Sequence, residues 1–199
     1  MHKMPEVKMS KAFNKGQRLD LSNAVSVRNV EIDSISTIRK LQHDSYMRLY
    51  AQHATDFETA AFKELLESSK YADDLHQTIS KRQVYAAYLD HRMVGIAAWS
   101  DYPDYQASGR LRFLFVDPFF ARCGVGATLL GSLEVIVTSV HCRDFSVRTV
   151  VPSMGFFEKS SYCTTSYGAL PVGNHESFEI AFMSKSEFSE HKIISTLKH

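Results

Sequence analysis

The chain has 199 residues, 44% of them hydrophobic, which suits one folded domain with a substantial core. Lysine and arginine number 23 and aspartate and glutamate 22, so the net charge of +1 gives no reason to expect binding to nucleic acid or an acidic membrane surface. No apolar run approaches transmembrane length, the polar N-terminus lacks an apolar signal core, and the three cysteines form no C-x-x-C pair. We therefore expect a cytoplasmic protein without a disulfide framework or structural metal.

The first part of the chain predicts a strand followed by helices. Residues 1–24 are mostly polar and indicate a flexible leader. Apolar and polar residues then alternate over a short, irregular strand from Val25. Asp33 or Ser34 is suited to cap a first helix, and the run 55–58 (Thr-Asp-Phe-Glu) has the pattern of a capping box that opens a second. Residues 71–79 predict one or two further helical turns.

The remaining elements alternate between strands and helices. Residues 84–89 and 93–100 predict a β-hairpin, and 101–109 a loop. Strands are expected at 111–116, 145–151, 162–167 and 177–183, with an irregular connection at 168–176. A long amphipathic helix is expected at 125–141, and a short one at 153–159. These elements predict an α/β fold in the order β-α-α-β-β-β-α-β-α-β-β.

The turn between strand 111–116 and helix 125–141 has the properties of an anion site. It contains Gly124 and Gly126, which let a ligand approach the backbone, and it leads into a helix whose first N–H groups have no partner within the helix. Arg122 and the N–H groups of residues 122–127 are the expected donors. The third glycine of a dinucleotide fingerprint and the Lys-Ser/Thr ending of a P-loop are both absent. A purely structural turn, with glycines for packing, remains the alternative.

This stretch resembles the acetyl-CoA-binding motif of the GCN5-related N-acetyltransferases (GNAT). Val116-Asp117-Pro118 matches Val-x-Pro, and Gly124-Val125-Gly126 matches the Gly-x-Gly that follows. The similarity extends over about residues 25–183. It implies a mixed central sheet flanked by helices, in one domain at 25–184 with a tail at 185–199. Ala121 departs from the pattern because the family usually has Arg or Gln there, and Arg122 could supply that charge.

The resemblance also implies how acetyl-CoA would bind. The backbone of Leu114, Phe115 and Val116 would hold the pantetheine arm and the acetyl group, as a sheet edge holds a peptide. The pyrophosphate would lie against the turn and the start of its helix, at Arg122, Cys123, Gly124, Val125, Gly126 and Ala127.

The catalytic groups are harder to assign. Many family members have an Asn at the end of the next strand and a Tyr on the short helix that protonates the departing thiolate. Here Val150 or Val151 and Phe157 stand near those positions, and a phenyl ring donates no proton. Tyr162 is the candidate replacement, although the start of a strand is its simpler interpretation. Arg110 and Arg112 stand where some relatives place a glutamate that acts as the general base, and an arginine cannot take this role. They are either exposed arginines or ligands for a substrate carboxylate or phosphate.

The sequence thus predicts acetyl-CoA-dependent N-acetylation of a small-molecule or protein amine. The alternative is a catalytically weak acyl-CoA-binding module, which the missing Tyr and Asn favour. An aromatic-lined acceptor pocket is expected at the helix junction and beside the third strand, from Tyr46, Tyr50, His53, Asp56, Trp99, Tyr102 and Tyr105. Edge strands near the C-terminus could pair two copies into a homodimer.

Overall fold

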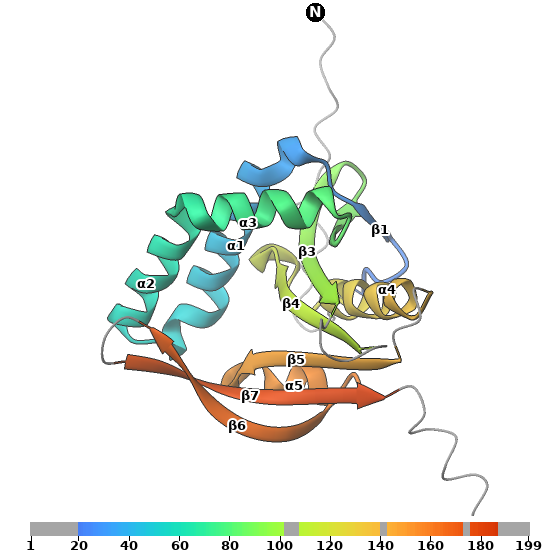
Figure 1. Cartoon of the computed structure of the whole chain (residues 1–199). Helices are drawn as coiled ribbons and strands as arrows, with labels where there is room; N and C mark the ends of the chain where they lie inside the picture. Colours follow the sequence, from blue (N-terminus) through green and yellow to red (C-terminus); the bar gives the residue numbers. More distant parts are fainter. Residues whose placement is uncertain (1–19, 102–107, 140–142, 173–175, 187–199) are drawn as a thin grey trace, which may run out of the picture.

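The computed structural model describes residues 20–101, 108–139, 143–172 and 176–186. They form a seven-stranded sheet of order β1-β2-β3-β4-β5-β7-β6 (Figure 1). Neighbouring strands are antiparallel except for the pair β4–β5, which is parallel. The strands are β1 (Val25–Asn29), β2 (Val84–Leu89), β3 (Arg92–Asp101), β4 (Ser108–Val116), β5 (Asp144–Val150), β6 (Cys163–Val172) and β7 (Glu176–Ser186). The fold is the mixed α/β sheet that the sequence predicts.

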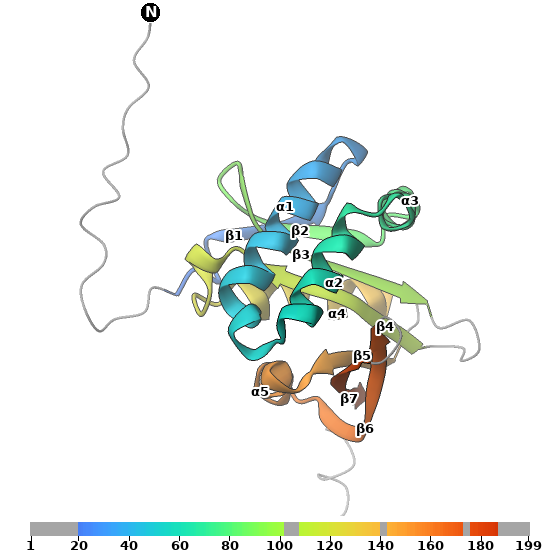
Figure 2. The same cartoon turned by 90° about the vertical axis from the view of Figure 1, so that its left-hand side faces the viewer.

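Helices cover both faces of this sheet. The helices are α1 (Ile35–Ser45), α2 (Asp56–Glu67), α3 (Ser69–Ser80), α4 (Val125–Ser139) and α5 (Met154–Glu158), and a π-helical turn, η3 (Tyr46–Tyr50), continues α1. Helices α1, α2 and α3 lie on one face and α4 on the other (Figures 1 and 2). None of the described helices is both long and apolar enough to cross a membrane.

Two hydrophobic clusters match these two layers. The cluster beneath α4 includes Leu129 and Leu133 of the helix, with Leu111 and Val147 of the sheet. The cluster beneath α1 and α3 includes Ile38 and Leu75 with Ile96 of β3. Leu75 and Ile38 are almost fully buried, so α1 and α3 are fixed against the sheet by apolar burial.

The structure extends several predicted elements. Residues 69–80 form a complete third helix, whose N-cap Ser68 accepts a hydrogen bond from the Tyr71 amide. The capping box at Thr55 and Glu58 is confirmed. The predicted loop at 168–176 is wrong over its first half, because β6 pairs with β7 as far as Val172. Pro171 is compatible with this strand because β6 is the edge of the sheet. Gly168 leaves room for the Phe182 ring, which a Cβ at this position would approach to 2.8 Å.

The expected leader and tail both contribute residues to the folded part. Leu21 donates a backbone hydrogen bond to the Cys123 carbonyl at 2.9 Å and packs on the α4 cluster. At the other end, Lys185 of β7 forms an ion pair with Glu134 of α4 at 2.8 Å. Residues 1–19 and 187–199 lie outside the described residues, as do Tyr102 and Tyr105 of the expected acceptor pocket.

Candidate functional site: a strand opening and a helix N-terminus

Strands β4 and β5 pair over only part of their length. Their register runs from Ser108 opposite Asp144 to Leu111 opposite Val147, and stops there. β3 continues to pair with the other side of β4 as far as Val116. The backbone of residues 113–116 therefore has no strand partner on its β5 side within the described part of the chain. A strand with one free edge can bind an extended ligand through its own N–H and C=O groups.

A bulge in β4 coincides with this opening. Trp99 pairs with Leu111 and Ala98 with Phe113, so Arg112 is the extra residue on β4. The Arg112 guanidinium donates to Thr78 Oγ1 at 2.7 Å and to Asp74 Oδ2 at 2.6 Å, both on α3. Bulges bend a strand and redirect its side chains. This one turns Arg112 onto α3 at the point where β4 and β5 separate.

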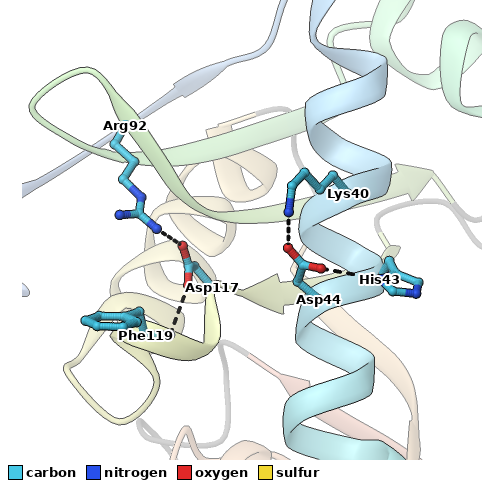
Figure 3. Close-up of polar contacts among 6 residues, drawn as sticks. All are labelled: Lys40, His43, Asp44, Arg92, Asp117 and Phe119. Atoms are coloured by element: carbon cyan, nitrogen blue, oxygen red, sulfur yellow. Dashed lines mark hydrogen bonds and ion pairs between the residues drawn. The ribbon is translucent and has the colours of Figure 1, made fainter.

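The turn after β4 is held by Asp117. Its carboxylate accepts a hydrogen bond from the Phe119 amide at 2.9 Å and one from Arg92 of β3 at 2.6 Å (Figure 3). Its own amide donates to the Val94 carbonyl at 2.9 Å, which extends the β3 pairing by one residue. These contacts fix the direction in which the chain leaves β4 toward α4.

The start of α4 presents free amide groups. Thr128 is the first helical residue whose N–H reaches a carbonyl of the preceding turn, that of Gly124 at 3.0 Å. The amides of Val125, Gly126 and Ala127 have no backbone acceptor among the described residues. They lie at the positive end of a 15-residue helix, which favours an anion there.

The backbone of this turn explains its composition. Gly124 has φ +86°, in the left-handed region that glycine adopts without strain. Arg122 also has a positive φ, +66°, and is exposed. Cys123 is partly buried and its Sγ contacts the Ala121 carbonyl at 3.7 Å. Ala121 thus contributes a backbone carbonyl to the turn. Arg122 provides the turn with an exposed positive charge.

One acidic residue lies beside this anion site. A Cβ built on Gly124 would come within 2.7 Å of Asp20 Oδ1, so that carboxylate lies directly against the glycine. Asp20 accepts hydrogen bonds from the amide and the hydroxyl of Ser22, and these lower the pKa of its carboxyl. The negative charge of Asp20 opposes any anion that binds at the turn.

Helix α5 packs against the same turn. A Cβ on Gly126 would meet the Phe156 ring at 3.3 Å and a Val116 methyl group at 3.5 Å. Gly126 therefore provides the space in which α5 approaches the end of β4. Phe156 touches Phe157 edge to face, and Phe157 itself is buried.

Tyr162, the predicted proton donor, lies in the core beneath α4. It is 3% exposed and its ring meets that of Phe157. Burial and the Glu134 carboxylate raise the pKa of Tyr162 far above its ordinary value. In the structure Tyr162 packs in the core. Its catalytic role stays a prediction, and its burial argues against that role.

An aromatic cluster lines the opposite, α1–α3 side of the opening. The rings of Tyr46 and Phe62 stack with centroids 4.0 Å apart, Phe62 lies 6.2 Å from Phe115 of β4, and Tyr50 lies 5.1 Å from Tyr46. Burial raises the pKa of Tyr50 to about 12 and also raises the pKa of Tyr46, so both phenols stay protonated near neutral pH. Trp99 is not part of this cluster, because it is buried beneath α4.

Three polar residues of α1 contact one another. Asp44 accepts a hydrogen bond from Lys40 and contacts His43 Nδ1 at 3.3 Å (Figure 3). The Lys40 hydrogen bond lowers the pKa of Asp44, so this carboxylate is ionised and engaged at neutral pH. No group of three His, Cys, Asp or Glu side chains in the described part of the chain is placed to hold a metal ion.

These features together suit a phosphorylated ligand with an extended arm. The free amides of α4 match a pyrophosphate, and the unpaired edge of β4 matches a chain of amides such as pantetheine. The family model described as "Acetyltransferase (GNAT) family" matches residues 29–162. The chain belongs to this family of acetyltransferases, as its turn motif suggested.

Similar solved structures have the same fold. One is a GCN5-related N-acetyltransferase from Rhodopseudomonas palustris, with a TM-score of 0.70 and 19% identity over 81% of this chain and 94% of that one. PaiA N-acetyltransferase from Thermoplasma acidophilum, in complex with coenzyme A, has a TM-score of 0.63 and 15% identity over 81% and 98%. YncA from Salmonella typhimurium, a putative acetyltransferase with its cofactor acetyl-CoA, has a TM-score of 0.61 and 13% identity over 84% of this chain and 96% of that one. No curated protein matches the chain.

Proposed function

We propose that this protein transfers an acetyl group from acetyl-CoA to a primary amine by direct attack in a ternary complex. The observation that carries the proposal is the separation of β4 from β5 beside the free amides of α4. In this assignment the pyrophosphate lies at residues 122–127, and the pantetheine arm along the free edge of Leu114, Phe115 and Val116. Family membership supports acetyl-CoA as the cosubstrate.

The reaction needs a neutral amine and a polarised thioester. The amine nitrogen bonds to the acetyl carbon, the C–S bond breaks, the nitrogen loses a proton and coenzyme A leaves as a thiolate. Backbone N–H groups on the free edge of β4 would polarise the acetyl carbonyl. The aromatic cluster of Tyr46, Tyr50 and Phe62 would enclose the amine and exclude water, which favours its neutral form.

Proton transfer in this proposal does not use the family's tyrosine. Phe157 stands in its place and carries no hydroxyl, and Tyr162 is buried elsewhere. Water would accept the amine proton and protonate the thiolate. This loss of a positioned acid corresponds to a rate lower by about 10²–10⁴-fold than with a general acid.

The first experiment is a calorimetric titration of acetyl-CoA, with desulfo-CoA and ATP as controls. Micromolar binding, about −8 kcal/mol, is expected for acetyl-CoA. Product formation with a panel of amines is then measured by mass, because the exposed thiol of Cys163 would react in a thiol-detection assay. Correctly folded protein that binds no acetyl-CoA would contradict the proposal.

A second candidate function is an acyl-CoA-binding module without turnover. The specific observation that favours it is the buried phenyl ring of Phe157 at the position of the proton donor. Tight binding of acetyl-CoA without acetylation of any amine in the panel would support the module. Acetylation of even one amine at a rate above the uncatalysed reaction would exclude it.

A further inference from the structure

A solvent-open cavity of about 380 Å³ lies over the paired ends of β4 and β5 and continues onto β7 and β6. Two arginines and four hydroxyl-bearing residues dominate its lining, which contains no carboxylate. The full lining is Ser108, Arg110, Ser146, Val147, Arg148, Thr165, Phe182, Met183 and Ser184. A ligand in this cavity would meet positive charge and hydroxyl groups.

The strand registers place the polar residues of this cavity in one row. Arg110 of β4 is opposite Ser146 of β5, which is opposite Ser184 of β7. Leu111, Val147 and Met183 belong to the core beneath α4. Since strand side chains alternate between faces, the polar row points to the opposite face, on which α1, α2 and α3 lie. The cavity is therefore on the same face as the aromatic cluster.

Two buried polar atoms in this row lack a partner. Neither Arg110 Nε nor Ser146 Oγ has a hydrogen-bond partner among the described residues, although both atoms are buried. A buried polar group without a partner has lost its hydration with no compensating hydrogen bond, so such groups usually serve a ligand or water. These atoms lie on neighbouring strands at paired positions, which suits one ligand group that accepts from both.

Arg112, unlike the two arginines of the cavity, is neutralised by an acidic side chain. Only two residues from Arg110, it is paired with Asp74 and Thr78 of α3. Arg148 is exposed, and no described acidic side chain lies within ion-pair distance of it or of Arg110. The cavity thus holds two arginines that the described protein does not neutralise.

We infer that this cavity binds an anionic group, a carboxylate or a phosphate, on the acceptor amine. This inference rests on the proposed function and names its substrate class. Arg148 directly follows the last paired residue of β5, and the unpaired part of β4 begins about 7–10 Å from Arg110 at strand spacing. An acceptor with its anionic group on the arginines and its amine several bonds away would extend toward Leu114 and Phe115. Arginine suits such a group because its planar fork binds two oxygens at once.

The test compares pairs of amines that differ only in the anionic group. 6-Aminohexanoate is compared with hexylamine, and 6-aminohexyl phosphate with 6-aminohexanol, as acceptors of acetyl from acetyl-CoA. We expect kcat/KM to be about tenfold or more higher for the anionic member of at least one pair, and the preferred pair distinguishes carboxylate from phosphate. Equal or lower kcat/KM for both anionic members would overturn the inference.

Variants then test the residues. Arg148→Gln, at an exposed position that tolerates the change, should reduce the anionic preference to below about threefold, mainly through KM. Arg110→Gln should act in the same direction, and Lys63→Gln on the exposed surface of α2 is the matched charge control. A preference that survives in both arginine variants, or that falls equally in Lys63→Gln, would contradict the assignment.

A binding measurement separates this inference from the proposed function. Ligand-observed NMR of all four amines, in the presence of coenzyme A, requires no turnover. Binding of an anionic amine that is lost in Arg148→Gln supports the cavity even if no amine is acetylated, in which case only the proposed function fails. Equal binding within both pairs, or none at all, would reject the cavity assignment.

Discussion

The two sides of the β4 opening offer a ligand different parts of the chain. On the α4 side, the groups available to a ligand are backbone amides at Val125, Gly126 and Ala127 and the free edge of β4. On the α1–α3 side, they are side chains: aromatic rings around Phe62 and the guanidinium groups of Arg110 and Arg148. Backbone groups survive substitution as long as the fold does, whereas side-chain groups change with each mutation. This difference explains why the turn proposed to hold the cosubstrate resembles a family motif despite Ala121, while the proposed acceptor site has no such motif.

The largest effect on this comparison is expected from the backbone of the turn. In Gly124→Ala the new methyl group would lie 2.7 Å from Asp20 Oδ1, at a φ of +86° that alanine avoids. We expect the free energy of unfolding to fall by about 1–2 kcal/mol and the affinity for acetyl-CoA to fall about tenfold or more, because the amides are displaced. Denaturant unfolding and calorimetry measure the two effects.

Gly131→Ala, inside the helix that Gly124 precedes, is the matched control. No atom lies within 4 Å of a Cβ at this position, and alanine favours helix by up to about 1 kcal/mol over glycine. Stability should rise slightly and acetyl-CoA affinity should stay unchanged. Equal losses of affinity in both variants would mean that Gly124 does not act through the backbone of the turn.

An intermediate effect on stability is expected from substitutions of two arginines on the α1–α3 side, Arg112 and Arg148. Arg112→Met removes the hydrogen bonds to Asp74 and Thr78 that connect β4 with α3. We expect stability to fall by about 1–2 kcal/mol, or roughly 2–8 °C in Tm. Arg148→Met should change stability by less than about 0.5 kcal/mol. Thermal unfolding that shows equal losses for the two variants would remove the distinction between a structural and a ligand-binding arginine.

The smallest effect is expected from the charge of Asp20. Asp20→Asn keeps an oxygen that can accept from Ser22 but removes the negative charge beside Gly124. Affinity for acetyl-CoA should rise about two- to threefold at low ionic strength, and the gain should vanish at high salt because exposed charges are screened. A gain that is independent of salt, or a loss of affinity, would contradict an electrostatic role for this residue.

The sequence by itself determined the parts of the protein that depend on local patterns. Apolar periodicity predicted the strands and the long helix, and the strand–glycine–helix order predicted free amides at Val125 and its neighbours. The capping box at Thr55 fixed the start of α2 because its two hydrogen bonds involve residues three apart. The family motif at the proposed cosubstrate site was recognisable for the same reason: it is built from consecutive residues.

Only the tertiary structure decided the features that join distant segments. The sequence does not distinguish the roles of Arg110 and Arg112. In the structure a bulge turns Arg112 onto α3, whereas Arg110 lies beside Ser146 and Arg148. Tyr162 is close in sequence to Phe157, which stands at the family's proton-donor position, but the end of α5 places Tyr162 beneath α4 beside Glu134. Asp20 reaches the turn across about a hundred residues of chain. Such placements depend on strand register and helix packing between segments far apart in the chain, which local patterns do not encode.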